Sequence, residues 1–123
     1  GELAANSWEM FLKYPAFGVG INNFIPTMAD NILTGPSRFL QPVHNIFLLI
    51  LAETGIVGLI GFIGMIGYPI KKMCNVKFTM YNLLPWGMIL VLGMFDHYFL
   101  TLPQGYRLLF LVWGLSFLHV RIA

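Results

Sequence analysis

The chain has 123 residues, of which 58% are hydrophobic and only 10% are charged. Because soluble domains average about 25% charged residues, this composition excludes an ordinary soluble domain. The net charge is only +2 and the basic residues form no stripe, which argues against a nucleic-acid partner. The single cysteine excludes an internal disulfide and a cysteine-based zinc site. The apolar residues gather in long runs, so the sequence predicts an all-α, polytopic membrane protein.

Residues 2–13 are predicted to form an amphipathic helix. Ala4, Trp8 and Leu12 fall on one face, and polar and charged side chains fall on the opposite face. Pro15 ends the helix because the residue before a proline is pushed out of the helical region. We expect the helix to lie in the membrane interface, with Trp8 at the depth of the headgroups. Packing on a soluble loop domain is the alternative.

A turn and a long loop are predicted after this helix. Two glycines flank Val19 and permit tight backbone geometry, but a lone Gly-Val-Gly is weak evidence for phosphate binding. Residues 25–43 combine three prolines with polar side chains and predict an irregular loop outside the membrane core. Arg38 lies in this loop. Residues 1–45 are therefore expected to form an extracytoplasmic loop region that contains the amphipathic helix.

The remaining residues, 46–123, are predicted to form the transmembrane region. About three spans are expected, approximately over 46–68, 79–95 and 106–120. The first would rise roughly 34 Å as a straight helix, enough to cross a hydrocarbon core of about 30 Å. A short loop over 69–78 carries three lysines, which favours a cytoplasmic position. Residues 1–45 and 96–105 then lie outside the cytoplasmic membrane. The start without methionine predicts a fragment of a larger protein whose N-terminal spans are missing.

Most side chains that could do chemistry collect at the predicted outer face. His44 has the properties of a general base, since an unperturbed histidine titrates near pH 6.5. The alternative for His44 is a structural role, as a cap of the following helix. Arg38 and Arg107 could bind a phosphate or diphosphate with their guanidinium forks, or simply contact lipid headgroups.

Glu53 is the only charged residue between Ile46 and Tyr68. At helical rise it would lie roughly 12 Å deeper than His44. A carboxylate inside a span usually faces a partner or a water-filled cavity, so we expect either substrate binding or a hydrogen bond to a neighbouring helix.

Asp96-His97 is predicted to be an acid–base pair or a turn that caps the second span. His44, His97, Asp96 and Glu53 together could form a metal site, but no spacing motif supports one, and no metal is predicted.

Three segments resemble the C-terminal half of the O-antigen ligase and polymerase superfamily. They are Tyr14-Pro-Ala-Phe-Gly-Val-Gly-Ile-Asn-Asn-Phe24, His44-Asn-x-Phe-Leu-x-x-x-x-Glu53-x-Gly55-x-x-Gly58, and Asp96-His-Tyr with Gln104-Gly105. The resemblance covers roughly residues 8–118. It implies a membrane glycosyltransferase that moves glycan from an undecaprenyl-diphosphate carrier to an acceptor hydroxyl outside the cytoplasmic membrane. The acceptor would be a lipid-anchored core, a growing glycan or a protein serine, and no metal or other cofactor would be needed.

The resemblance also implies roles for individual residues. The histidine that matches His44 is expected to be catalytic, and arginines of the outer loop are expected to hold the diphosphate. The residues expected to bind substrate are Arg38, Asn45, Glu53, Asp96, His97 and Arg107. The expected partners are the lipid-linked donor, the acceptor, membrane lipid and the missing N-terminal spans. A non-enzymatic membrane protein, such as a flippase, a transporter or a structural subunit, is the alternative.

Overall fold

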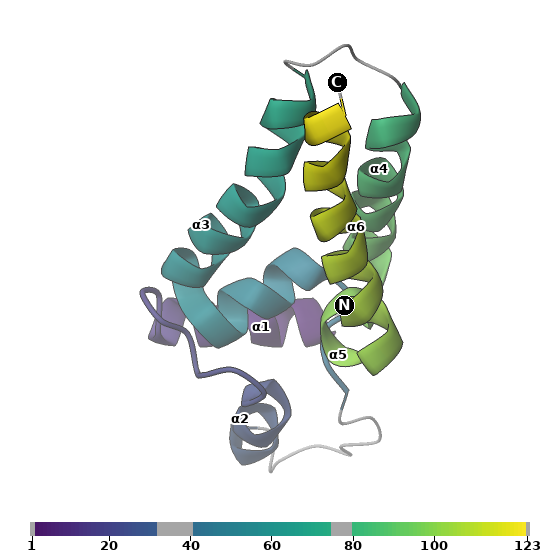
Figure 1. The fold of residues 1–123 in the computed structure, drawn as a ribbon. Helices are drawn as coiled ribbons and strands as arrows, with labels where there is room; N and C mark the ends of the chain where they lie inside the picture. Colours follow the sequence, from purple (N-terminus) through teal and green to yellow (C-terminus); the bar gives the residue numbers. More distant parts are fainter. Residues whose placement is uncertain (1, 32–40, 75–79, 123) are drawn as a thin grey trace.

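The computed structural model describes residues 2–31, 41–74 and 80–122 of the chain. Every element of these residues is helical, which confirms the all-α class. The elements are α1 (Glu2–Lys13), α2 (Phe24–Asn31), α3 (Ile46–Cys74), α4 (Met80–Phe95), α5 (Tyr98–Thr101) and α6 (Pro103–Ile122). In Figure 1 the upper part of α3 rises beside α6 and α4, α1 lies behind the lower part of α3, and α2 lies below.

Helix α1 confirms the amphipathic helix predicted over 2–13. Its buried side chains, Ser7 and Met10, face the protein, and Met10 belongs to a core cluster with Phe24 of α2 and Leu49 of α3. Trp8, which was expected to meet the headgroups, remains 50% exposed. The helix therefore packs on the protein along one side and leaves an aromatic side open.

Helix α2 contradicts the first part, residues 25–31, of the irregular loop that was predicted over 25–43. The helix begins at Phe24, so Pro26 falls in its first turn. A proline is tolerated there because the first backbone N–H groups of a helix have no partner within the helix. Arg38 lies outside the described residues.

Helix α3 is not the straight helix predicted over 46–68. It is broken at Gly55, whose φ of 67° and ψ of −163° are not helical. In Figure 1 the segment before the break crosses in front of α1, and the segment after it turns upward. The rise of roughly 34 Å calculated for residues 46–68 as one straight helix therefore does not hold. The segment from Ile56 to Cys74 would still rise about 28 Å, close to the thickness of a hydrocarbon core.

The turn over residues 15–20 fills the break in α3. In an unbroken helix, the N–H groups of Ile56 and Val57 would donate to the carbonyls of Ala52 and Glu53. Four hydrogen bonds with the turn replace these two. They join Val19 N–H to Ala52 O (2.9 Å), Gly20 N–H to Glu53 O (2.8 Å), Ile56 N–H to Pro15 O (2.9 Å) and Val57 N–H to Ala16 O (3.3 Å). We call residues 15–20 and 52–57 together the interlock. It satisfies backbone N–H and C=O groups that the break would otherwise leave without partners.

Two glycines make this close approach possible. Gly18 and Gly55 both have left-handed φ angles, of 66° and 67°. A Cβ atom at Gly18 would collide with the backbone of residues 52–53, and one at Gly55 would collide with the backbone of residues 16–17. Each glycine therefore meets backbone of the other segment, where a side chain has no room.

Residues 69–74 of the loop predicted over 69–78 are helical, because α3 continues through Pro69 to Cys74. Proline has no N–H, so it leaves the carbonyl four residues earlier without a helical partner. That carbonyl belongs to Met65, and it accepts a hydrogen bond from the indole Nε1–H of Trp113 in α6 at 2.9 Å. The partner from α6 explains why the helix tolerates the proline. Residues 75–79 lie outside the described part of the chain.

Helices α4 and α6 agree with the apolar runs predicted over 79–95 and 106–120, although α6 begins earlier, at Pro103. Trp86 of α4 donates to Ser116 Oγ of α6 at 2.9 Å. Short helix α5 lies within the loop expected over 96–105 and was not predicted.

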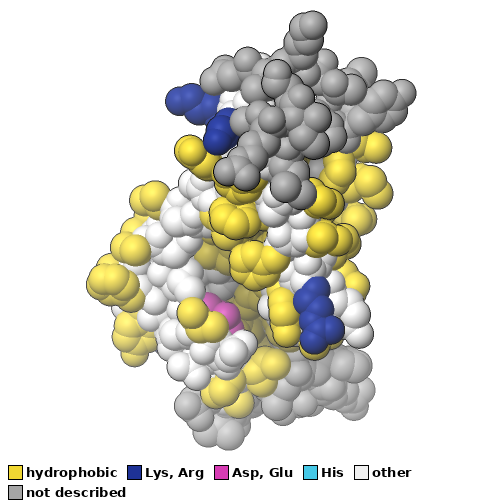
Figure 2. Space-filling model, in the orientation of Figure 1, with side chains coloured by type: hydrophobic (Ala, Val, Ile, Leu, Met, Phe, Trp, Pro, Cys, Tyr) yellow, Lys and Arg dark blue, Asp and Glu magenta, His cyan; other side chains and the backbone are white. Residues whose placement is uncertain are grey.

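Only one described helix, α3, is long and apolar enough to cross a membrane, while Leu83–Phe95 is a shorter apolar helix. Figure 2 shows hydrophobic side chains over α3 and α6, with Lys and Arg side chains towards both ends of that face. Exposed apolar side chains include Ile60 of α3, Val91 of α4 and Leu111 of α6. The second and third spans stay predictions.

Candidate functional site

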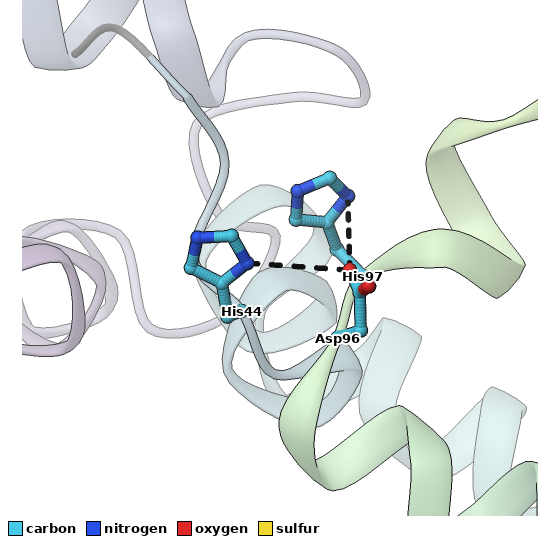
Figure 3. Close-up of side chains that lie close together, drawn as sticks. All are labelled: His44, Asp96 and His97. Atoms are coloured by element: carbon cyan, nitrogen blue, oxygen red, sulfur yellow. Dashed lines mark ion pairs between the residues drawn. The ribbon is translucent and has the colours of Figure 1, made fainter.

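Three polar side chains from two distant parts of the sequence meet near the start of α3. His44 lies just before α3, and Asp96 and His97 lie between α4 and α5. Asp96 Oδ1 is 4.0 Å from His44 Nδ1 and 4.0 Å from His97 Nδ1. The two imidazole rings stack, with centroids 5.2 Å apart and planes inclined by 25°. We call these three residues the histidine cluster (Figure 3).

Asn45 positions this cluster by capping α3. Its Oδ1 accepts hydrogen bonds from the backbone N–H groups of Phe47 and Leu48, each at 3.0 Å. Its Nδ2 donates to the carbonyl of Met94, near the end of α4, at 3.1 Å. Asn45 thus provides acceptors for the first N–H groups of α3, and its hydrogen bond to Met94 connects this helix start to the segment that carries Asp96. The cap that was considered for His44 is provided by its neighbour, and the His44 side chain remains 50% exposed.

Gly93 allows α3 and α4 to approach at this point. It is buried, and a Cβ atom there would collide with the side chain of Ile46, the first residue of α3. The close contact brings the last turn of α4 against the first turn of α3. It therefore sets the separation of His44 from Asp96.

His97 is held by Thr101, one turn further along. The ring nitrogen His97 Nδ1 lies 2.6 Å from the hydroxyl oxygen Thr101 Oγ1. The same hydroxyl lies 3.1 Å from the backbone carbonyl oxygen of His97. The contact between Nδ1 and Oγ1 orients the His97 ring, and which of the two atoms donates depends on which ring nitrogen carries the hydrogen.

Burial lowers the pKa of His97 from its ordinary value, and the nearby His44 lowers it further, whereas the Asp96 carboxylate opposes these effects. His97 therefore resists protonation. Asp96 itself is more exposed, with 59% of its side chain accessible, and at 4.0 Å from both rings it forms ion pairs rather than hydrogen bonds when a ring is charged. This arrangement suits proton transfer, with a half-exposed imidazole beside a carboxylate that would stabilise its charged form.

The cluster could also ligate a metal ion. Donor atoms of His44, Asp96 and His97 all lie within 4.8 Å of one another, and histidine nitrogens with a carboxylate oxygen form a donor set that zinc accepts. Nδ1 of His97 is already engaged by Thr101, so a metal would have to displace that bond or use Nε2. Glu53, the fourth residue considered for a metal site, is not part of this cluster.

Glu53 instead connects α3 to α2. Its Oε1 accepts a hydrogen bond from the backbone N–H of Phe24, the first residue of α2, at 3.3 Å. This contact matches the structural alternative, a hydrogen bond to a neighbouring helix. Glu53 also lines a cavity of about 260 Å³, which is otherwise mainly apolar and includes Thr101 on another wall. The cavity therefore extends between the interlock and the residue that holds His97.

The two arginines differ in what the structure describes. Arg107 is exposed in the second turn of α6, and its guanidinium has no ion pair within the described ranges 2–31, 41–74 and 80–122. Arg38 falls outside those ranges, so its distance from the histidine cluster is not described.

Thr101 is the residue of this site that the sequence analysis missed. A histidine and a threonine four residues apart meet on the same face of a helical turn, and this spacing could have indicated the pair. The sequence analysis did not use this spacing because it did not predict α5, a helix of one turn.

The described residues thus form an apolar helical chain in which one helix could cross a membrane and a polar cluster lies near the start of that helix. A protein-family model described as O-antigen ligase matches residues 1–63, about half of the chain. The chain therefore belongs to the O-antigen ligase family. No curated protein and no solved structure matches it significantly.

The matched residues include the interlock, Asn45 and His44, whereas Asp96 and His97 lie beyond them. The family is associated with membranes and with lipid-linked glycans, and its activity is ligase-like glycan transfer.

Proposed function

We propose that this chain is part of a membrane glycosyltransferase that transfers or polymerises glycan from an undecaprenyl-diphosphate-linked donor. The acceptor is a hydroxyl group, and the reaction takes place at the outer face of the cytoplasmic membrane. The observation that carries the proposal is the assembly of His44, before the start of α3, with Asp96, after the end of α4. Family membership supports the same class of reaction.

His44 is the general base in this proposal. Its Nδ1 faces Asp96, which favours a hydrogen on that nitrogen and leaves Nε2 to take the acceptor proton. The acceptor oxygen forms a bond to the anomeric carbon, and the bond from that carbon to the diphosphate oxygen breaks. Undecaprenyl diphosphate leaves with the electron pair. Asp96 stabilises the imidazolium that forms on His44.

The remaining candidate residues have supporting roles. Arg107 is exposed and would neutralise the diphosphate, with Arg38 as a second cation from the outer loop. Asn45 orients His44 through the cap of α3. Glu53 shapes the cavity beside the site.

The proposed topology has spans in α3, α4 and α6, with residues 1–45 and 96–105 outside the membrane and the transmembrane region over 46–123. Lys71 and Lys72 lie in the last turn of α3, at the opposite end from His44. This separation supports a cytoplasmic position for the lysines and an outer position for the site.

The test uses the full-length gene in cells, with His44→Ala compared with Lys71→Ala at the opposite end of α3. At matched membrane levels, we expect His44→Ala to lose surface glycan while lipid-linked precursor accumulates on the outer leaflet. Lys71→Ala should keep surface glycan. Precursor trapped on the inner leaflet would instead identify a flippase. Unchanged glycan would reject the catalytic role of His44 and favour a structural subunit.

A further inference from the structure

The histidine cluster combines the donor atoms that a transition metal ion prefers. His44 and His97 each offer an imidazole nitrogen and Asp96 offers a carboxylate oxygen, and these atoms all lie within 4.8 Å of one another. Two imidazoles with one carboxylate suit zinc and similar ions such as cobalt, whereas magnesium and calcium prefer sites built from oxygen atoms. The donor set therefore favours a transition metal ion of the zinc class.

The cluster is somewhat wider than a closed zinc site. Zinc bonds of about 2.0 to 2.2 Å place neighbouring ligand atoms of a tetrahedron about 3.3 Å apart, and Asp96 Oδ1 lies 4.0 Å from Nδ1 of each ring. The side chains of His44 and Asp96 are 50% and 59% exposed, so they have room to rotate. An ion that enters from the exposed side needs only to draw these side chains inward.

The backbone that carries the three ligands is held by contacts of the protein itself. Asn45 joins the start of α3 to the end of α4, and Gly93 lets α4 pack closely against Ile46. His97 is the least exposed of the three ligands, and Thr101 Oγ1 lies 2.6 Å from its ring. Because the ligands are already brought together, an ion loses less of its binding energy to ordering the chain.

Metal binding does not depend on which ring nitrogen carries the hydrogen in the free protein. A metal ion takes one nitrogen of a neutral imidazole, and the single hydrogen of the ring then lies on the other nitrogen. At His97 the ion uses Nδ1 in place of the contact with Thr101, or it uses Nε2. At His44 it uses Nδ1, which faces Asp96 (Figure 3). Nε2 of His44 then carries the hydrogen.

We propose that His44, Asp96 and His97 bind one transition metal ion of the zinc class, and that the bound ion inhibits the reaction. The inhibitory part rests on the proposed function, in which Nε2 of His44 takes the acceptor proton. When Nδ1 is bound to the metal, Nε2 carries a hydrogen and has no lone pair for that proton. The ion is therefore a reversible inhibitor and not a cofactor. Binding itself requires only the geometry of the cluster.

The first experiment measures binding of Co²⁺ to the purified full-length protein, without a histidine tag, from the visible absorption of the bound ion. We expect one Co²⁺ per chain at this site, displaced by Zn²⁺ and not by Mg²⁺. His97→Ala and Asp96→Asn each remove a ligand, and we expect each to weaken binding by at least about tenfold. His119→Ala is the matched control, because it removes a histidine near the C-terminal end of α6, and it should keep the wild-type affinity.

A second experiment tests inhibition with the same protein, lipid-linked donor and a glycan acceptor. Each protein is compared with its own rate in the presence of a chelator. We expect saturating Zn²⁺ to lower the wild-type rate by about 10²- to 10⁴-fold, the contribution of a general base, and the chelator to restore it. His97→Ala should need at least about tenfold more Zn²⁺ for the same fractional inhibition.

Each alternative result contradicts a defined part of the account. Absence of Co²⁺ binding in the wild type, or equal affinity in the wild type, His97→Ala and Asp96→Asn, would overturn the metal site. Asp96→Asn nearly preserves the size of the side chain, so it keeps the test valid if His97→Ala destabilises the protein. Displacement of Co²⁺ by Mg²⁺ as readily as by Zn²⁺ would overturn the class of ion.

Binding and inhibition can also fail separately. Binding of Zn²⁺ at the cluster without any loss of transfer would overturn the inhibitory role. If the metal-free wild-type protein transferred no glycan while its Co²⁺ signal still depended on His97 and Asp96, the proposed function would fail and the metal site would stand.

Discussion

The interlock and the histidine cluster lie at the two ends of the short first segment of α3, and they are built in opposite ways. The interlock consists of backbone hydrogen bonds between 2.8 and 3.3 Å, closed by glycines that leave no room for a side chain. The histidine cluster consists of side chains that are partly exposed, with carboxylate-to-ring distances of 4.0 Å. The interlock is held by backbone groups in a fixed geometry, whereas the histidine cluster presents partly exposed imidazole and carboxylate groups.

This difference shows how similar-looking sequence features divide between architecture and chemistry. Gly18-Val19-Gly20 was weak evidence for phosphate binding and Glu53 was a candidate for substrate binding, yet the recorded contacts of both join segments of the chain to one another. His44, which could have been a helix cap, is left open because Asn45 takes that role. Substitutions in the two regions should accordingly affect different measurements.

The largest effect on stability is expected for Gly55→Ala. The alanine would have to adopt a left-handed φ and would collide with the backbone of residues 16–17. We expect the free energy of unfolding to fall by about 2 to 5 kcal/mol, measured for the full-length protein in detergent. Gly61→Ala is the matched control in the same helix, because a Cβ atom there has open space around it. An equal loss in both variants would contradict the interlock.

A smaller loss is expected when Glu53 is replaced. Glu53→Ala leaves the Phe24 N–H without its acceptor, which costs about 1 to 3 kcal/mol. Glu53→Gln keeps an acceptor oxygen and should recover most of that stability, as judged from thermal unfolding. If Glu53→Gln retained full stability but lost transfer activity, the carboxylate charge would belong with the chemistry and not with the architecture.

Asn45 connects the two regions and should show an intermediate response. Asn45→Ala removes the cap of α3 and should cost about 0.5 to 2 kcal/mol in unfolding free energy. Asn45→Asp keeps the accepting oxygen for Phe47 and Leu48 but loses the donor to Met94. We therefore expect Asn45→Asp to restore the stability of the helix start more fully than transfer activity. Equal recovery of both quantities would show that the tie to α4 does not position His44.

The smallest effect is the pH dependence that His97 contributes. Its pKa is lowered in the folded protein, chiefly by burial, so the unfolded chain takes up a proton before the folded protein does. The neutral His97 ring contributes to the stability of the folded protein. This contribution is fully present when the pH is above the ordinary histidine pKa of about 6.5, and it is lost as the pH falls through the lowered pKa of the folded state. Thermal unfolding at a series of pH values should show this decline in the wild type and a shallower decline in His97→Phe. Identical pH dependence in the two proteins would contradict a lowered pKa of His97.

The sequence was sufficient for the helices whose apolar pattern is local. The periodicity of Trp8 and Leu12 predicted α1, and the apolar runs predicted the cores of α3, α4 and α6. The errors arose where a distant segment changes the local preference. The prediction of a straight helix over 46–68 is wrong because the turn over residues 15–20 hydrogen-bonds to the backbone on both sides of Gly55. The helix was predicted to end before Pro69, but it continues to Cys74 because Trp113 donates to the Met65 carbonyl that the proline leaves without a helical partner.

The candidate site was predictable in its residue types but not in its assembly. His44 and Asp96 were chosen for their chemistry, and nothing in their spacing shows that they meet. Their meeting depends on Gly93, which allows α4 to approach Ile46, and on Asn45, which bonds to the end of α4. Contacts of this kind join residues that are far apart in sequence, so no local pattern records them.

The most direct test of the central claim is the transfer rate of purified full-length His44→Ala, with and without added imidazole. Loss of a general base should lower the rate by about 10²- to 10⁴-fold, with thermal unfolding unchanged because the His44 side chain is 50% exposed. We predict that imidazole restores part of the rate, since it can occupy the space beside Asp96 and accept the acceptor proton. A wild-type rate in the folded variant would contradict the assignment of His44 as the base.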